Sequence, residues 1–352
     1  MTDNFTCTLN PARIVFGQGA LLQVSVELDR LGAERALVLS TPFQKSDADA
    51  LATRLGDKAV GTFARAAMHT PISVTQEALA VVKTCQADCV VSFGGGSTIG
   101  LGKAIAYRTD LPQIVIATTY AGSEVTPILG ETEDGVKTTK RDPRILPETV
   151  IYDPDLTLGL PVDMSVSSGL NAMAHAVEAL YAQDRNPITS LQAVEGLRAL
   201  KHALPKVVQA PDDIDARATA LYGSWLCGTV LGSVGMSLHH KLCHTLGGSF
   251  DTPHADTHAI LLPHSAAYNA VSAADVLRPV AEMFGGSIGG GLHDFAASLG
   301  APMALSDLGL TEADLDRAAD IAVRNPYWNP RPIERDAIRA LLQNAWAGTR
   351  PD

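Results

Sequence analysis

The pattern of apolar and polar positions divides the chain into two parts. In residues 1–155, short apolar runs alternate with segments whose apolar residues have helical spacing. The runs predict strands at residues 36–39, 60–63, 89–91, 114–116 and 149–152, and the spacings predict helices at residues 20–31, 47–55, 74–85 and 97–107. This alternation is typical of a doubly wound, mostly parallel, Rossmann-like sheet, whose ligands bind at the carboxyl ends of the strands.

The pattern changes after Asp153-Pro154. Before it, polar residues 128–140 predict a hairpin with a turn at Glu133-Asp134-Gly135. Beyond Pro161, β-type runs nearly vanish and long helical patterns rich in alanine and leucine follow. We therefore predict an α/β domain in residues 1–158 and an all-α domain in residues 159–352.

Composition narrows the class of protein. The 352 residues are enough for two domains, and a net charge of −11 argues against a nucleic-acid binder. Five sparse cysteines do not form a disulfide framework, so we expect thiols in a reducing compartment. No signal peptide and no apolar stretch of membrane-spanning length are visible, so we expect a cytoplasmic protein without a membrane partner.

A glycine-rich turn lies between the third predicted strand and the next helix. Gly94, Gly95, Gly96 and Ser97 would let the backbone approach a ligand closely, and the helix start would present N–H groups to a pyrophosphate. The alternative is an ordinary strand–helix turn. The motif is not G-x-G-x-x-G, because Ser97 interrupts the glycine spacing, and it is not a P-loop, because Lys103 is too far along the chain.

Two further segments are candidates for the same ligand. Thr118, Thr119 and Ser123 follow the next strand and offer hydroxyl groups for phosphate or ribose. Thr41-Pro42 follows an early strand, where an acidic residue would favour NADH by binding the 2′-hydroxyl of the ribose. Since no acidic residue stands there, we expect that NADH and NADPH are both accepted.

Histidines are concentrated in one window. Six of the ten lie there, namely His239, His240, His244, His254, His258 and His264. His240 and His244 share a helix face, as do Asn171 and His175 upstream. We predict one polar site from these residues, with His239, His258 and His264 in supporting or surface roles.

Motifs spread over the chain resemble those of the iron-containing alcohol dehydrogenase family. They are GGGS from Gly94, TTYAGSE from Thr118, DPDLT from Asp153 and the segment from His244 to His254. The resemblance implies the dehydroquinate synthase-like architecture, a nucleotide-binding α/β domain followed by a helical domain. It also implies a nicotinamide cofactor and a homodimer.

The resemblance further implies a divalent metal held by an aspartate and three histidines. The matching positions here are Asn171, His175, His240 and His254. Asn171 replaces the carboxylate by a neutral amide, which weakens metal binding. We therefore expect no metal. A second departure is Gly100, where typical members have aspartate.

These departures are shared with one branch of the family, the maleylacetate reductases, which the segment from Asn325 to Pro332 also resembles. The branch reduces the conjugated C=C bond of a small dicarboxylate, maleylacetate, to give 3-oxoadipate. Hydrogen-bond donors can stabilise the enolate of such a reaction.

The predicted catalytic residues, which stabilise the oxyanion and deliver a proton, are His175, His240, His244, His254 and Tyr327. The predicted substrate-binding residues are Asn171, Tyr120, Lys140, Arg144 and Arg331. Cys243 is expected beside the site without a catalytic role.

Three alternatives remain open at this point. The chain can be a metal-dependent alcohol or polyol dehydrogenase that tolerates Asn171. It can be a lyase similar to dehydroquinate synthases, or a binding protein that has kept the fold.

Overall fold

The computed structural model describes residues 5, 7, 12–133 and 136–352. The chain forms two compact units, of which the first contains the described residues 12–160 and the second contains residues 161–352 together with residues 5 and 7. Each unit is described by itself.

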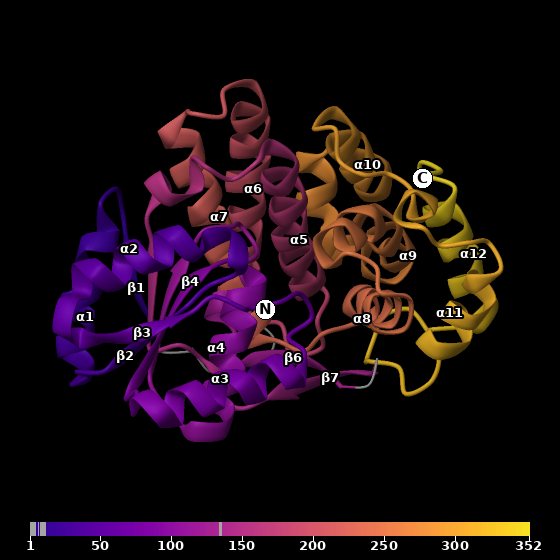
Figure 1. The fold of residues 1–352 in the computed structure, drawn as a ribbon. Coiled ribbons are helices and arrows are strands. Elements are labelled where there is room, and N and C mark those ends of the chain that lie inside the picture. The colour runs from indigo at the N-terminus through magenta and orange to yellow at the C-terminus, as the bar shows by residue number, and fades with distance from the viewer. Residues whose placement is uncertain (1–4, 6, 8–11, 134–135) are drawn as a thin grey trace. The chain divides into compact units, whose positions relative to one another are not determined.

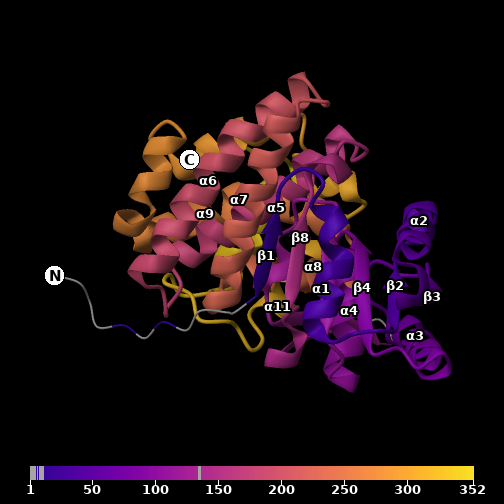
Figure 2. The same cartoon turned by 90° about the vertical axis from the view of Figure 1, so that its left-hand side faces the viewer.

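The first unit is built on a parallel sheet of six strands in the order β1-β8-β5-β4-β2-β3 (Figure 1). The strands are β1 (Arg13–Phe16), β2 (Ala36–Leu39), β3 (Ala59–Phe63), β4 (Cys89–Gly94), β5 (Gln113–Ala117) and β8 (Thr149–Tyr152). The predicted parallel α/β sheet is thus confirmed. The edge strand β1, which lies beside β8 in Figure 2, was not predicted, although its residues Ile14, Val15 and Phe16 form an apolar run.

A separate antiparallel hairpin, β6 (Ile128–Glu133) and β7 (Val136–Arg141), lies where polar residues predicted it. Asp134 and Gly135 of the predicted turn lie outside the described residues.

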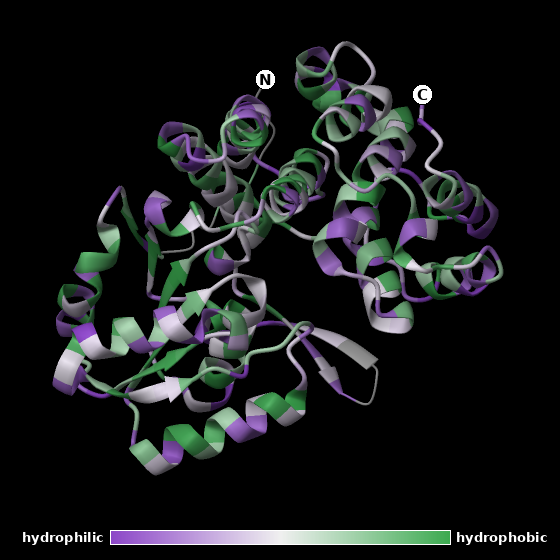
Figure 3. Ribbon diagram, turned by 45° about the horizontal axis from the view of Figure 1, so that its top comes forward, coloured by the Kyte–Doolittle hydropathy of each residue, from purple (hydrophilic) through white to green (hydrophobic). Residues whose placement is uncertain are grey.

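Helices cover both faces of the sheet. They are α1 (Val24–Leu31), α2 (Lys45–Leu55), α3 (Ile72–Cys85) and α4 (Gly96–Thr109), with short 3₁₀ turns at Ala20–Gln23, Pro42–Gln44, Gly56–Lys58, Ser123–Val125, Pro143–Ile145 and Pro154–Thr157. On β2, Val38 packs into one apolar core with α1 and α2, and Leu37 into the other with α3 and α4. Strands buried on both faces are apolar at most positions, which explains the continuous runs in the sequence. Figure 3 shows these strands in hydrophobic colours.

The second unit contains only helices and a 3₁₀ turn, Leu305–Leu308, within residues 161–352, all of which are described. The helices are α5 (Val162–Leu180), α6 (Pro187–Gln209), α7 (Ile214–Ser233), α8 (Leu238–Phe250), α9 (His254–Met283), α10 (Ile288–Ser298), α11 (Asp314–Ala322) and α12 (Arg335–Trp346). The predicted all-α character is confirmed. α5 packs against α6, α7 and α9 and is buried from Ser165 to Leu180.

Within the described part of the chain, no helix combines the length and apolarity that crossing a membrane requires.

Two glycines allow α6 and α7 to approach closely. A Cβ atom on Gly223 would lie 2.8 Å from Leu200 Cγ and 3.1 Å from the Gly196 carbonyl oxygen. A Cβ atom on Gly196 would lie 2.7 Å from Cys227 Sγ. The helix pair therefore has no room for larger side chains at this crossing.

We predict that Gly223→Val lowers the free energy of unfolding by about 1–3 kcal/mol, because the added atoms overpack the crossing. Urea unfolding followed by circular dichroism measures the change. Gly159→Val is the control, since a Cβ atom on Gly159 meets nothing within 4 Å. Equal losses in the two variants would contradict the prediction.

Candidate active site

The glycine-rich turn joins β4 to the start of α4. Gly94 has a φ of +153°, and its Cβ atom would lie 2.6 Å from Thr98 Oγ1. A Cβ atom on Gly95 would lie 2.6 Å from Thr119 Cγ2. Gly95 is the N-cap residue of α4 and provides no side-chain cap, so the first turn of the helix presents backbone N–H groups. Such a turn is suited to an anion.

The three predicted cofactor segments meet at this turn. The Thr118 N–H donates to the Gly94 carbonyl at 3.2 Å, and Gln44 Nε2 donates to Thr118 Oγ1 at 3.0 Å. Gln44 ends the 3₁₀ turn that begins directly after Thr41. The segments follow β2, β4 and β5, and β2 and β4 are the neighbours at which the strand order reverses. Doubly wound sheets bind ligands at such a switch point.

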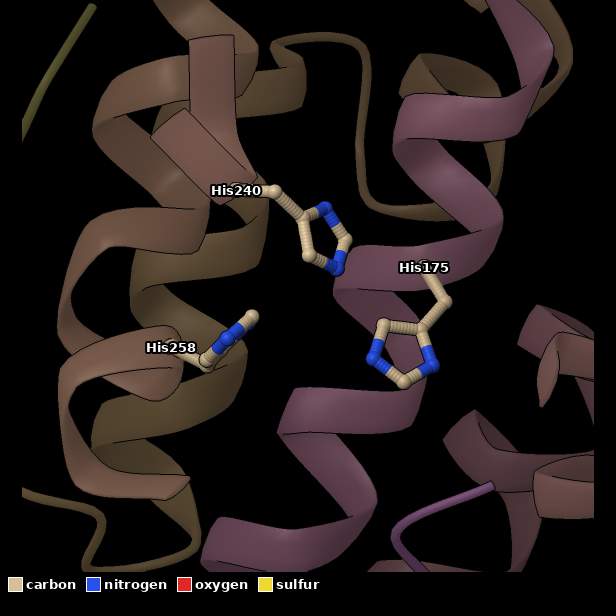
Figure 4. Close-up of side chains that lie close together, drawn as sticks. All are labelled: His175, His240 and His258. Carbon is tan, nitrogen blue, oxygen red and sulfur yellow. The ribbon is translucent and has the colours of Figure 1, made fainter. Parts of the chain in front are cut away.

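A second polar group lies inside the helical unit. His175 on α5, His240 on α8 and His258 on α9 place ring nitrogens within 4.8 Å of one another, and all three side chains are buried. Figure 4 shows the three imidazoles turned toward a common space. The sequence predicted either a supporting or a surface role for His258. The surface role is wrong, because the first turns of α9 direct the side chain into the unit.

Glu178 orients this histidine cluster, which is His175, His240 and His258. Its carboxylate accepts a hydrogen bond from His240 Nδ1 and, at 2.8 Å, another from the Ser237 N–H at the start of α8. Glu178 is 1% exposed. Sequence reasoning missed it, although an acidic residue one turn after His175, between alanine, valine and leucine residues, was a usable signal.

A chain of hydrogen bonds from Ser265 through His239 reaches His258. His239 Nδ1 lies 2.9 Å from Ser265 Oγ, and His239 Nε2 lies 2.9 Å from His258 Nδ1. Among the described residues, His258 Nε2 has no hydrogen-bond partner. Burial, and secondarily the neighbouring histidines, holds the pKa values of His175, His239 and His258 well below the ordinary value. These rings are therefore neutral near pH 7.

His264, predicted with them, is also buried, and burial is the main reason that its pKa falls to about 4.

His244, one turn after His240 on α8, forms a pair with Tyr327. His244 Nδ1 lies 3.1 Å from the Tyr327 hydroxyl. Burial raises the pKa of Tyr327, and the charge of Glu178 raises it further. Tyr327 therefore keeps its proton and can donate it to His244 Nδ1.

The remaining predicted catalytic and polar residues lie in this unit as well. The rings of His254 and His258 are 4.4 Å apart between centroids. Asn171 is buried on α5, one turn before His175. The structure thus places His254 beside His258, and Asn171 on the same helix as His175.

The predicted substrate-binding cations have internal partners. Lys140 pairs with Glu131 at 2.7 Å, and both Nε and one terminal nitrogen of Arg144 donate to Asp142. Arg331 donates to the Tyr268 carbonyl at 3.2 Å and stacks on the ring of that tyrosine at 3.9 Å. Tyr120 is fully buried in the α/β unit. Their binding of substrate stays a prediction.

Cys243 lies beside the cluster, as predicted, with Sγ 3.6 Å from His239 Nε2. It is fully buried. All five cysteines, each among the described residues, are thiols without a disulfide.

The histidine cluster fits a divalent cation. Three neutral imidazoles are a donor set that catalytic zinc uses, and a carboxylate on the second nitrogen, as on His240, is typical of metal-binding histidines. The three imidazoles include no charged oxygen. They are therefore better suited to a cation that prefers nitrogen ligands than to a hard cation. The expectation of a metal-free site conflicts with this geometry and is corrected.

Comparison with known proteins matches both units to models of one protein family. Residues 11–154 match the model of "Iron-containing alcohol dehydrogenase", and residues 165–346 match that of "Fe-containing alcohol dehydrogenase family, C-terminal". Both family descriptions name a metal, iron.

The relatives extend the match over nearly the whole chain. The maleylacetate reductase of Rhizobium sp. strain MTP-10005 is 66% identical over 99% of both chains, and that of Burkholderia cepacia is 56% identical over 96% of this chain and 97% of its own. The crystal structure of maleylacetate reductase from Agrobacterium tumefaciens has a TM-score of 0.95 and 66% identity, covering 99% of this chain and 100% of its own. The chain belongs to the iron-containing alcohol dehydrogenase family, and its resemblance to the maleylacetate reductase branch is confirmed.

Proposed function

We propose that this oxidoreductase reduces the conjugated C=C bond of maleylacetate to give 3-oxoadipate, with NADH or NADPH as the hydride donor. The observation that carries the proposal is the 66% identity to a maleylacetate reductase over 99% of both chains. In this proposal residues 1–158 bind the dinucleotide and residues 159–352 carry the substrate chemistry. We also propose a homodimer that works in the cytoplasm.

The cofactor's pyrophosphate would lie on the first turn of α4, bound by backbone N–H groups from Gly94 to Ser97. Hydroxyl groups of Thr118, Thr119 and Ser123 would bind phosphate or ribose, and Thr41-Pro42 would contact the adenosine ribose. The convergence of these segments at one switch point supports this placement.

The proposed reaction transfers a hydride to the alkene carbon that bears the carboxylate. The electron pair of the C=C bond shifts toward the ketone, whose oxygen takes the negative charge of an enolate. A proton then adds to the carbon beside the ketone. One NADH and one proton are consumed, and NAD⁺ and 3-oxoadipate form.

His244 and Tyr327 are suited to the polar half of this reaction. We assign the Tyr327 hydroxyl as the donor to His244 Nδ1, which places the ring proton of His244 on Nε2. We assign His244 Nε2–H to donate toward the oxyanion, with Tyr327 replenishing the proton. His254 is a second donor in the same unit, and Asn171, one turn before His175 on α5, is proposed to bind the substrate.

The histidine cluster would hold a divalent cation through His175, His240 and His258. When bound, the cation would supply positive charge that stabilises negative charge on a nearby oxygen. Glu178 keeps His240 in the orientation that turns Nε2 toward the other two rings.

The two substrate carboxylates need cationic partners, which we propose among Arg331, Lys140 and Arg144, with Tyr120 as a further contact. Arg331 is the strongest candidate, because its recorded partners are a neutral carbonyl and an aromatic ring. Lys140 and Arg144 are each paired with a carboxylate, which substrate binding would have to displace.

We predict that maleylacetate causes rapid oxidation of NADH and of NADPH, and that simple aldehydes do not. Absorbance at 340 nm measures the rates, with and without prior chelator treatment. Faster turnover of aldehydes, lost with chelator, would instead favour a metal-dependent alcohol dehydrogenase. No net oxidation of NADH would favour a lyase or a binding protein.

We predict that His244→Gln lowers kcat by about 10²–10⁴-fold, because the proposed donor is removed. Tyr327→Phe should lower kcat by roughly 10-fold, because one hydrogen bond to His244 is lost. His202→Gln, at an exposed position of α6, is the control. The assignment fails if His244→Gln has the kcat of the control.

We predict that the purified protein, dialysed against Zn²⁺ and then washed, retains about one zinc ion per chain. His258→Ala should abolish retention, and Glu178→Gln should weaken affinity by about 10–100-fold because His240 loses its carboxylate partner. Mass-spectrometric metal analysis measures the content, with His202→Ala as the control. Unchanged zinc in His258→Ala would refute the proposed ligand set.

A further inference from the structure

Lys103 has a buried position in the α/β unit that the proposed reaction does not use. It lies on α4, seven residues after Gly96, and is 2% exposed. Its Nζ atom donates to the carbonyl of Ser123, to the carbonyl of Thr126 at 2.8 Å, to Thr126 Oγ1 at 2.9 Å and to the carbonyl of Ile128 at 3.0 Å. Four oxygens thus surround one nitrogen.

The oxygen cage, which is these four atoms, favours the ammonium form of Lys103. A neutral amine has a lone pair, and in this cage the lone pair would face an oxygen atom. Burial lowers the pKa of Lys103 to about 7, while the charge of buried Glu124 raises it. The direct bonds to oxygen act in the same direction as Glu124, so the bonded ammonium is the state that the geometry supports.

The cage belongs to the loop that follows β5. Thr126 Oγ1 also donates to the Ser123 carbonyl at 2.9 Å, so Lys103 and Thr126 together fix the turn that contains Ser123. The same loop begins with Thr118 and Thr119, which lie against Gly94 and Gly95. α4 therefore contacts the loop twice, through its glycine-rich start and through Lys103 two turns later.

We propose that Lys103 is a positioning residue for the dinucleotide site. It holds the loop from Thr118 to Thr126 in the conformation that places the hydroxyl groups beside the Gly94–Ser97 turn. Lys103 acts through the loop and does not itself touch the cofactor, because its N–H groups are used by the oxygen cage. This inference rests on the proposed function's assignment of the turn to a nicotinamide dinucleotide.

Lys103→Met tests the role, since it keeps a long side chain and removes the ammonium. We expect the Kd for NADH, measured by fluorescence titration without substrate, to rise by roughly 10–100-fold, as does the KM for NADH. The kcat at saturating NADH and the KM for maleylacetate should stay within about twofold. Lys83→Met, at an exposed position of α3, is the matched control.

A second pair of variants decides the question if Lys103→Met does not fold. Thr126→Val removes one oxygen of the cage and the bond to Ser123, and Thr126→Ser keeps both. The Kd for NADH should rise by about 3–10-fold in Thr126→Val and return to the wild-type value in Thr126→Ser.

The outcomes separate the two proposals. Failure of the wild-type protein to bind NADH overturns the proposed function and this inference with it. Wild-type binding with an unchanged Kd in folded Lys103→Met, or an equal Kd in the two Thr126 variants, overturns the role of Lys103 alone.

Discussion

The arrangement of polar side chains in the helical unit depends on one buried carboxylate. Glu178, 1% exposed, accepts from the backbone at the start of α8 and from the ring of His240. A buried charge is tolerated only when hydrogen bonds and dipoles compensate it, and here a helix N-terminus and an imidazole do so. Because the same carboxylate fixes α8 and turns His240 Nε2 away from itself, the position of the helix and the orientation of the ring are set together.

In the α/β unit, the loop after β5 packs closely against the glycine-rich turn. The glycine-rich turn uses small residues rather than charge, since a side chain on Gly95 would collide with Thr119. The close approach of two loops then needs a fixed support behind it. Lys103 supplies that support by donating to the carbonyl oxygens of Thr126 and Ile128 and to Thr126 Oγ1.

The sequence predicted the parts of the fold in which burial leaves a clear pattern. β2 and β8 were predicted to the residue, because both are buried along their whole length and consist of apolar residues apart from Thr149 and Tyr152. β1 was not predicted, although Ile14, Val15 and Phe16 form an apolar run that was a usable signal. Helical spacing placed His240 with His244 and Asn171 with His175. It could not show that α9 turns His258 into the cluster, nor that Glu178 pairs with His240, because both depend on how separate helices pack. The expectation of a metal-free site failed for the same reason: it weighed Asn171 alone and not the three imidazoles that the packing brings together.

The central claim is that hydride adds to the conjugated alkene and not to the ketone. The most direct measurement uses NADH with deuterium at the transferred position and locates the label in the product by NMR. The account predicts 3-oxoadipate with its ketone intact and deuterium on the carbon beside the distal carboxylate. A hydroxy acid with deuterium on the carbon that bears the hydroxyl group would contradict it.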